Sequence, residues 1–191
     1  MREYTSDIAF TNKVKEIQKQ KGSRNSYAHM EQRGGWENTV TKQLRDFIAE
    51  RDSFYMSTVN SEGQPYIQHR GGPKGFLKVI DDHTLGFADF KGNRQYISYG
   101  NLEENNKVCL FLMDYPNRTR IKLWGTSEVN EEDVALIEQL SVSDYKGQVE
   151  RAFIIHVEAW DSNCPQHIVP RYTKQEITDL DVCEGCEPKD E

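Results

Sequence analysis

A short basic segment of the 191-residue chain carries residue types suited to binding an anion. Between Arg70 and Arg94 the sequence holds five lysines and arginines against three aspartates, in a chain of formal net charge −7. A cationic segment in an acidic protein predicts one bound anion rather than a general attraction to polyanions. The net charge also argues against nucleic acid and anionic membrane surfaces as partners.

The candidate anion site is the loop D-F-K-G-N-R at residues 89–94. It follows a predicted strand and opens a predicted helix over residues 93–104. Free backbone N–H groups and the positive end of the helix dipole would therefore converge there. Lys91 and Arg94 add full charges, and Asn93 adds a side-chain amide or a helix cap. This composition fits a phosphate group, and the alternative is a solvated loop that ends in a helix cap.

A second irregular segment, G-G-P-K-G at residues 71–75, lies shortly before this loop. Arg70 ends the preceding predicted strand and adds another cation. Three glycines among five residues would let a flat ring lie against the main chain, whose N–H and C=O groups recognise ring heteroatoms. The alternative is a wide hairpin that needs glycine for its turn geometry.

Most of the chain around these segments shows the period-two pattern of β-strands. Strands are predicted at 54–59, 65–69, 76–80, 84–90, 107–114, 120–129 and 152–160, and helices at 39–51 (capped by Asn38 or Thr39), 93–104 and 131–140. About seven strands joined mostly by hairpins, with helices at the edges, predict a mainly β fold. A closed or nearly closed antiparallel barrel would remove the exposed strand edges.

The length suits one domain with a full core, flanked by two extensions. Residues 1–35 read as an N-terminal arm with one helix, and 36–178 as the domain. Residues 179–191 carry six acids against one lysine and predict a disordered acidic tail. No apolar run approaches the roughly 20 residues of a membrane span, and the start has no signal-peptide core, which predicts a cytoplasmic protein.

Taken in order, these motifs resemble the flavin mononucleotide (FMN)-binding split barrels related to pyridoxamine 5′-phosphate oxidase. The resemblance covers residues 39–160. It is carried by the helix-then-hairpin order, by Arg70 followed by F-L-K at 76–78, by L-G-F at 85–87 leading into K-G-N-R at 91–94, and by I-K-L-W-G-T at 121–126. It implies a six- to seven-stranded antiparallel split β-barrel. It also implies a homodimer with flavin sites at the subunit interface.

The resemblance further implies which residues contact FMN. Arg70, Lys91, Asn93 and Arg94 would hold the phosphate and the ribityl chain. The other implied contacts are a ring-lining turn, a strand lysine, a neighbouring tryptophan and a C-terminal segment from the second subunit: Gly72, Pro73, Lys74, Gly75 and Phe76, then Lys78, Trp124, Gln166 and Arg171. The alternatives are an exposed strand lysine for Lys78, a core tryptophan for Trp124, and an ordinary surface segment for the last two.

The function implied is an oxidoreductase that exchanges electrons or hydride between FMN and an unidentified small molecule. No catalytic residue is assigned, although His167 is a conceivable acid or base. The first alternative is a non-catalytic FMN-binding protein for storage, sensing or stress response. The second is a haem-binding barrel with His69, His83 or His167 as the axial ligand. The strand motif that binds substrate phosphate in true pyridoxamine phosphate oxidases is absent, so pyridoxal phosphate synthesis is not predicted.

The four cysteines do not form the pattern of an extracellular disulfide framework. Cys109 falls in an apolar strand and is predicted to be inert core. Cys183 and Cys186 form a C-x-x-C in the acidic tail, where the nearby acids oppose a reactive thiolate. The pair reads as an incidental or weakly metal-binding tail, or as a regulatory thiol pair. Zinc needs about four ligands, so no metal site is predicted.

Overall fold

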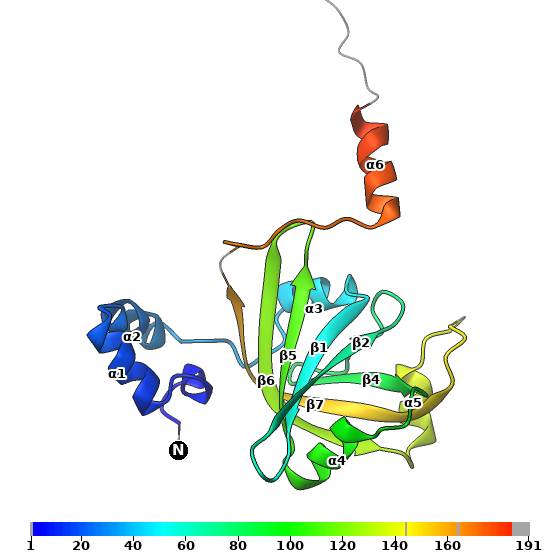
Figure 1. Ribbon diagram of the computed structural model, residues 1–191, viewed down its shortest axis with the longest axis horizontal. Coiled ribbons are helices and arrows are strands. Elements are labelled where there is room, and N and C mark those ends of the chain that lie inside the picture. Colours follow the sequence, from blue (N-terminus) through cyan, green and yellow to red (C-terminus); the bar gives the residue numbers. More distant parts are fainter. Residues whose placement is uncertain (1, 144, 164, 185–191) are drawn as a thin grey trace, which may run out of the picture.

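The computed structural model describes residues 2–143, 145–163 and 165–184, and its centre is a seven-stranded antiparallel sheet of order β2-β1-β5-β6-β7-β4-β3. Figure 1 shows the long strands curling around a common interior. The strands are β1 (Ser53–Val59), β2 (Pro65–Gly71), β3 (Lys78–Val79), β4 (Thr84–Phe90), β5 (Lys107–Asp114), β6 (Thr119–Asn130) and β7 (Val149–Asn163).

Aromatic side chains on the inner faces of the strands close this sheet over its own core. Phe54 on β1 lies edge-on to Phe87 on β4, with 5.3 Å between the ring centroids. Phe87 in turn stacks on Phe153 of β7 at 5.0 Å. Since β1 and β4 are not neighbours in the sheet order, these contacts require the sheet to curl into a barrel. The predicted mainly β antiparallel barrel is confirmed.

Helix α3 (Lys42–Ala49) packs on the core, and it begins later than predicted. The Thr41 hydroxyl accepts a hydrogen bond from the Leu44 amide, so Thr41 is the N-cap. The preceding residues stay extended because they pair with β7: the Trp160 indole N–H donates to the Thr39 carbonyl at 2.8 Å. The predicted cap at residue 38 or 39 is therefore wrong.

Helices α4 (Ile97–Glu104) and α5 (Val134–Leu140) also begin three or four residues after their predicted starts. Before α4, Arg94 and Tyr96 have φ angles of 62° and 53°, which a right-handed helix does not contain. Before α5, the Asp133 side chain accepts a hydrogen bond from the Leu136 amide at 3.0 Å and sets the start. The first of these shifts matters for the predicted phosphate loop.

The N-terminal arm contains more helix than the single segment predicted. Its buried Glu31 accepts hydrogen bonds from the Arg24 guanidinium and so ties the two ends of the second helix together. Trp36, which follows the arm, stacks on Trp124 of β6 with 4.7 Å between centroids and attaches the arm to the barrel. The arm elements are a 3₁₀ turn η1 (Thr5–Ile8), α1 (Asn12–Gln20) and α2 (Arg24–Gln32).

The chain after the barrel runs to a sixth α-helix, α6 (Lys174–Glu184). Thr173 and Glu176 cap it reciprocally, since each backbone amide donates to the other side chain. Helix α6 extends past residue 179, where the disordered acidic tail was predicted to begin. Residues 185–191 of this tail lie outside the described residues, and its disorder stays a prediction. None of the described helices is long and apolar enough to span a membrane.

Cys109 lies on the predicted strand, β5, but it is half-buried and is not one of the core residues. Burial raises the pKa of its thiol, against a smaller opposing effect of Lys122. A thiol that is protonated at neutral pH is a poor nucleophile, so we expect Cys109 to be unreactive.

Gly125 marks a bulge in the β6–β7 ladder, where the register shifts between Trp124 and Gly125. A Cβ atom there would lie 2.0 Å from the His156 carbonyl oxygen, so Gly125→Ala requires a shift of the backbone. We expect it to lower the free energy of unfolding by about 3 kcal/mol.

Urea unfolding followed by circular dichroism measures this effect. The matched control is Gly100→Ala inside α4, where nothing lies within 4 Å of the added methyl group. Because alanine favours a helix over glycine, the control is expected to gain up to about 1 kcal/mol. Equal stability of the two variants would contradict the close approach of β6 and β7.

Candidate functional site

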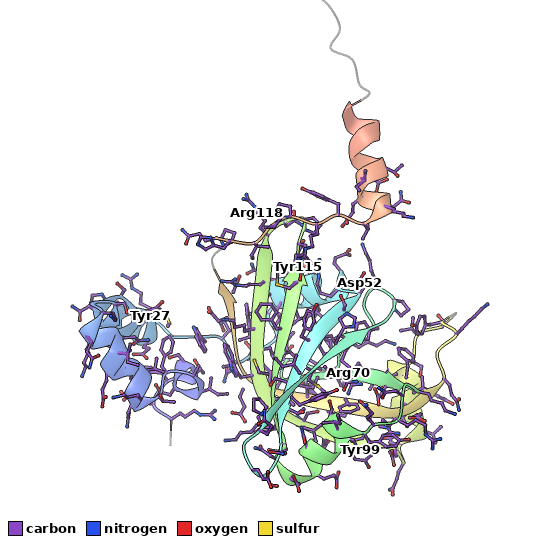
Figure 2. The ribbon with its side chains drawn as sticks, in the orientation of Figure 1. Tyr27, Asp52, Arg70, Tyr99, Tyr115 and Arg118 are labelled. Atoms are coloured by element: carbon purple, nitrogen blue, oxygen red, sulfur yellow. The ribbon has the colours of Figure 1, made fainter. Side chains whose placement is uncertain are left out.

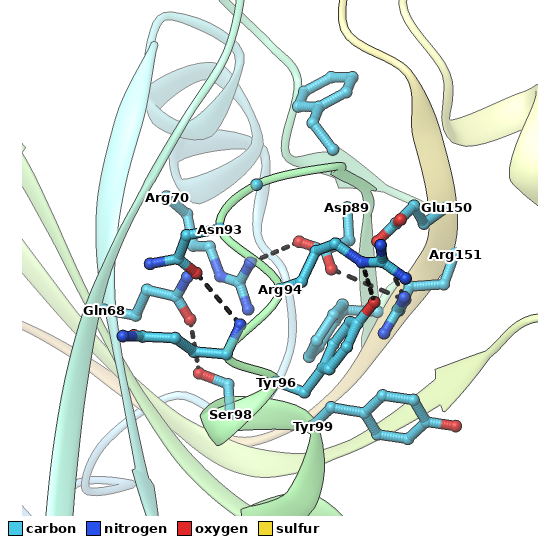
Figure 3. Close-up of a pocket in the computed structure, with 14 residues that line it drawn as sticks. Gln68, Arg70, Asp89, Asn93, Arg94, Tyr96, Ser98, Tyr99, Glu150 and Arg151 are labelled. Atoms are coloured by element: carbon cyan, nitrogen blue, oxygen red, sulfur yellow. Dashed lines mark hydrogen bonds and ion pairs between the residues drawn. The ribbon is translucent and has the colours of Figure 1, made fainter.

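A polar pocket opens where β2, β4 and β7 meet the loop that precedes α4 (Figure 3). The side chains around it are mostly arginines, carboxylates, amides and tyrosines. Its lining residues are Gln68, Arg70, Asp89, Phe90, Gly92, Asn93, Arg94, Gln95, Tyr96, Ser98, Tyr99, Glu150, Arg151 and Phe153.

The floor of the pocket is a buried network of one carboxylate and two guanidinium groups. Arg70 on β2 pairs with Asp89 on β4, with 2.5 Å between Nη1 and Oδ1. Asp89 also faces Arg151, its register partner on β7, with 3.8 Å between Oδ2 and Nε. These ion pairs join three strands at the pocket, of which β4 and β7 are also paired through backbone hydrogen bonds, whereas β2 pairs with β1.

Arg70 lies against the aromatic core and is only partly satisfied. Its guanidinium stands 4.8 Å from the Phe153 ring centroid and 5.4 Å from that of Phe87. Its Nε is buried and has no hydrogen-bond partner within the described residues. Buried donors are normally hydrogen-bonded, so a donor without a protein partner beside a pocket is suited to bind an acceptor atom of a ligand or a water molecule.

The same burial acts on both members of the ion pair. Burial lowers the pKa of Arg70, against the raising effect of Asp89. Burial raises the pKa of the Asp89 carboxyl, against the lowering effects of Arg70 and Arg151. An arginine stays protonated in proteins, and two guanidinium groups face this one carboxylate, so we take the network to be charged at neutral pH.

Arg151 is the second buried cation of the network and is held from several sides. Its guanidinium lies 5.0 Å from the Tyr96 ring and 5.1 Å from the Tyr99 ring. Its nitrogens also pair with Glu150 at 3.0 Å and with Glu131 at 3.2 Å. Arg151 is therefore the most fully neutralised cation of the pocket.

The predicted phosphate loop forms one wall of the pocket but does not open directly into a helix. Arg94 donates from Nε to the Tyr96 hydroxyl at 3.2 Å, which raises the pKa of this exposed arginine. The Asn93 side-chain oxygen accepts from the Gln95 amide at 3.2 Å, so Asn93 stabilises a turn rather than capping α4. The Lys91 amide donates to the Gln148 carbonyl at 2.8 Å, which anchors the loop to the segment before β7.

The structure brings together three of the four predicted phosphate ligands, because Arg70, Asn93 and Arg94 line the same pocket. Lys91 lies on the same loop but not among the lining residues. A second hollow adjoins the pocket and shares four of its residues: Gln68, Arg70, Asp89 and Phe90. The remaining lining residues of this hollow are His69, Gly71, Phe76, Phe87 and Ala88.

The glycine turn predicted to line a flavin ring is held by the protein's own backbone. The Gly72 amide donates to the Asp52 carbonyl and the Gly75 amide to the Arg51 carbonyl, each at 2.9 Å. The Phe76 amide donates to the Pro73 carbonyl, which shortens the predicted strand 76–80 to two residues. These N–H groups already donate to main-chain carbonyls and so are not free to bind a flavin ring. The Phe76 ring does border the second hollow.

Two predicted lysine contacts are engaged elsewhere. Lys74 is exposed and lies 3.3 Å from Glu50. Lys78 donates from Nζ to the carbonyls of Gln139 and Ser141, at 2.6 and 2.8 Å. Since these carbonyls end α5, Lys78 satisfies a helix C-terminus, the position where a cation is favoured.

The remaining predicted contacts lie away from the pocket within one chain. Trp124 stacks on Trp36 of the arm connection, on the outer face of β6. Gln166 is exposed, and the Arg171 guanidinium lies 4.8 Å from the Tyr115 ring, at the turn between β5 and β6 (Figure 2). Their assignment as FMN contacts therefore depends on a second subunit and stays a prediction.

Several pocket residues had no place in the sequence-based assignment. Ser98 donates to the Gln68 side-chain oxygen at 2.7 Å and ties α4 to β2. Glu150 and Arg151 stand at the start of β7, next to the apolar run that follows. A charged residue on the inner face of an otherwise apolar strand is the signal that would have found Arg151, because such a position is retained only with a partner.

These features define an antiparallel split barrel with a cationic pocket at the junction of three strands. The family model for pyridoxamine 5′-phosphate oxidase matches residues 40–167, so the chain belongs to that family. The family resemblance drawn from the sequence is thus confirmed, and so is the predicted split-barrel fold. No curated protein matches the chain.

Solved structures share the fold at low sequence identity. HupZ of Group A Streptococcus is 22% identical, with 69% of this chain and 98% of that chain covered and a TM-score of 0.53. A putative pyridoxamine 5′-phosphate oxidase of Lactobacillus delbrueckii is 21% identical, with 65% and 95% covered and a TM-score of 0.52. An FMN-binding protein of Syntrophomonas wolfei is 15% identical, with 76% and 97% covered and a TM-score of 0.53.

The network predicts a large effect of removing the shared negative charge. Asp89→Asn keeps the shape of the side chain but leaves two buried guanidinium groups without their common carboxylate. We expect the free energy of unfolding to fall by about 3 kcal/mol.

Denaturant unfolding at neutral pH measures this loss, with Asp46→Asn as the matched control. Asp46 pairs with Lys42 on the exposed face of α3, and a surface pair of this kind contributes less than about 1 kcal/mol. If both substitutions lower the free energy of unfolding by the same amount, Asp89 does not hold the two arginines in place.

Proposed function

We propose that this protein binds FMN and acts as an oxidoreductase, exchanging electrons or hydride between FMN and a small molecule. The observation that carries the proposal is the meeting of Arg70, Asn93 and Arg94 at one pocket, in a chain that belongs to the pyridoxamine 5′-phosphate oxidase family. When bound, FMN would supply the redox chemistry, and the protein would supply binding, orientation and electrostatics.

The donor set of the pocket fits a phosphate group. Among the residues that the structure describes, the buried Nε of Arg70 has no hydrogen-bond partner, and Arg94 makes its side-chain hydrogen bond through Nε, to the Tyr96 hydroxyl. The Asn93 amide nitrogen makes no hydrogen bond within the described residues, so it too can donate. Guanidinium groups bind phosphate through parallel N–H bonds. Arg70, Asn93 and Arg94 would therefore hold the phosphate, with Lys91 adding charge from the rim.

The second hollow fits the flat ring system better than the glycine turn does. The rings of Phe76 and Phe87 are among its lining residues, and Gln68 and His69 add polar groups to the lining. An apolar wall with a few polar groups is the usual lining of a small-molecule site. The ring would then contact side chains of β2 and β4 rather than the amides of residues 72 and 75.

We further propose that the protein works as a homodimer. The outward side chains of β1 and β2 include Tyr55 and Ile67, which are 40% and 65% exposed. Phe111 on β5 is the register partner of Tyr55 and extends the same face. An apolar face on a curled sheet suits a second copy. Gln166 and Arg171 of the partner subunit would then complete each flavin site.

The first test is the absorption spectrum of the purified protein, followed by FMN titration of variants. Arg94→Ala should weaken FMN binding about tenfold or more because it removes a charge-assisted phosphate contact. Lys91→Ala should weaken it less, because Lys91 lies at the rim. Lys42→Ala, which removes an exposed cation far from the pocket, is the control and should bind FMN normally. If the Arg94 variant binds FMN with unchanged affinity, the assignment of Arg94 as a phosphate ligand is wrong.

The same preparation separates the proposed enzyme from its alternatives. Reduction of the bound flavin by NADH or NADPH, with reoxidation by a defined acceptor, supports an oxidoreductase. Bound flavin that neither nucleotide reduces supports a storage, sensing or stress role instead. A Soret band in place of flavin bands would indicate haem, for which His69 is the histidine that borders the second hollow.

The dimer proposal predicts a specific effect of charge on the β1–β2 face. Ile67→Asp places a carboxylate on that face, and we expect the dimer dissociation constant to rise at least about tenfold. Sedimentation velocity over a range of concentrations measures it. Val134→Asp is the matched control, because Val134 is also 65% exposed but lies on α5. A dimer equally stable in both variants would place the interface elsewhere.

A further inference from the structure

A separate, larger hollow lies between the N-terminal arm and the outer face of β6 and β7, and we call it the arm groove. Its volume is about 570 Å³, and it is open to solvent on one side. Figure 2 shows Tyr27 on the arm at one side of this region. The groove shares no lining residue with the polar pocket or with the second hollow, although Trp124 is among the FMN contacts that the family resemblance implies. Its lining residues are Ala9, Phe10, Val14, Tyr27, Met30, Gly35, Trp36, Arg120, Lys122, Trp124, Asp161 and Ser162.

The walls of the arm groove are a connected set of aromatic rings from both sides. Trp36 stacks on Trp124 almost in parallel, with 4.7 Å between centroids and 9° between the planes. Phe10 packs on Trp36 at 5.1 Å and on Tyr27 at 5.2 Å. Stacked and edge-on rings hold one another in place, so these walls form a defined surface suited to a flat apolar body.

Two cations stand on the barrel side of the groove. Arg120 and Lys122 are two residues apart on β6, so their side chains share its outer face. Neither side chain makes a hydrogen bond or an ion pair within the described residues, and the buried Arg120 Nε has no hydrogen-bond partner there. By contrast, other half-buried arginines are paired, as Arg51 is with Asp114.

We propose that the arm groove binds a small amphipathic anion, with an aromatic body and one carboxylate or sulfonate head group. The aromatic body would lie against Trp36 and Trp124. The head group would accept hydrogen bonds from Arg120 and Lys122, satisfying the buried Nε. Asp161 and Ser162 also line the groove, so the site selects a single negative charge rather than a polyanion.

The probe for this site is 8-anilinonaphthalene-1-sulfonate, and the uncharged comparison is N-phenyl-1-naphthylamine, which has the same aromatic body. Energy transfer from the tryptophans to the probe reports that the probe is bound, and the variants locate the site. We expect Arg120→Gln and Lys122→Gln each to weaken the sulfonate about tenfold while leaving the uncharged probe unchanged. Lys42→Gln is the control and should bind both probes as the natural sequence does.

Three outcomes would overturn the proposal: no saturable binding of the sulfonate, equal loss of both probes in the variants, or displacement of the sulfonate by FMN. Arg94→Ala should leave sulfonate binding intact, which separates this site from the FMN pocket whether or not FMN binds. If Arg120→Gln does not fold, as judged by thermal unfolding, the two probes on Lys122→Gln decide the question alone.

Discussion

The buried contact between Asp89 and the guanidinium groups of Arg70 and Arg151 is the constraint around which the site is built. A carboxylate in this position loses most of its hydration, and only close opposite charges offset that cost. The contact fixes β2, β4 and β7 relative to one another at the end where the pocket opens. Other features of the pocket follow from keeping two cations in an interior that would otherwise be apolar.

The aromatic rings around the network also follow from the cost of burying two cations. Phe87 and Phe153 cover the Arg70 guanidinium, and Tyr96 and Tyr99 cover that of Arg151. Ring faces attract a cation while keeping water away from it, so they partly replace its hydration. The left-handed conformation of Tyr96 delays the start of α4 and is part of the arrangement that sets this ring over Arg151. Helix α4 thus begins later than the sequence pattern predicts, because the residue before it places its ring over the Arg151 guanidinium.

The strands could be predicted from the sequence because the alternation of buried and exposed residues along β1, β5 and β6 is local. The family and its barrel followed from motifs in order, such as K-G-N-R after β4. The site was predicted only in part, because the residue that each charged side chain contacts lies far away in the sequence. Nothing near Lys78 in the sequence shows that it meets the carboxyl end of α5, and nothing near Asp89 shows that it faces Arg151. Long-range ion pairs set the roles of these side chains.

The charges of the pocket also bear on why a second subunit would be needed. Three arginines line it against the carboxylates of Asp89 and Glu150, which leaves a single net positive charge. A phosphate monoester carries a charge of about −1.5 to −2 at neutral pH, so one chain undercompensates it unless Lys91 swings in from the rim. The arginine that the family resemblance assigns to a second subunit, Arg171, would supply the missing charge. On this reasoning, the affinity for FMN should fall when the contacts of the proposed dimer are disrupted.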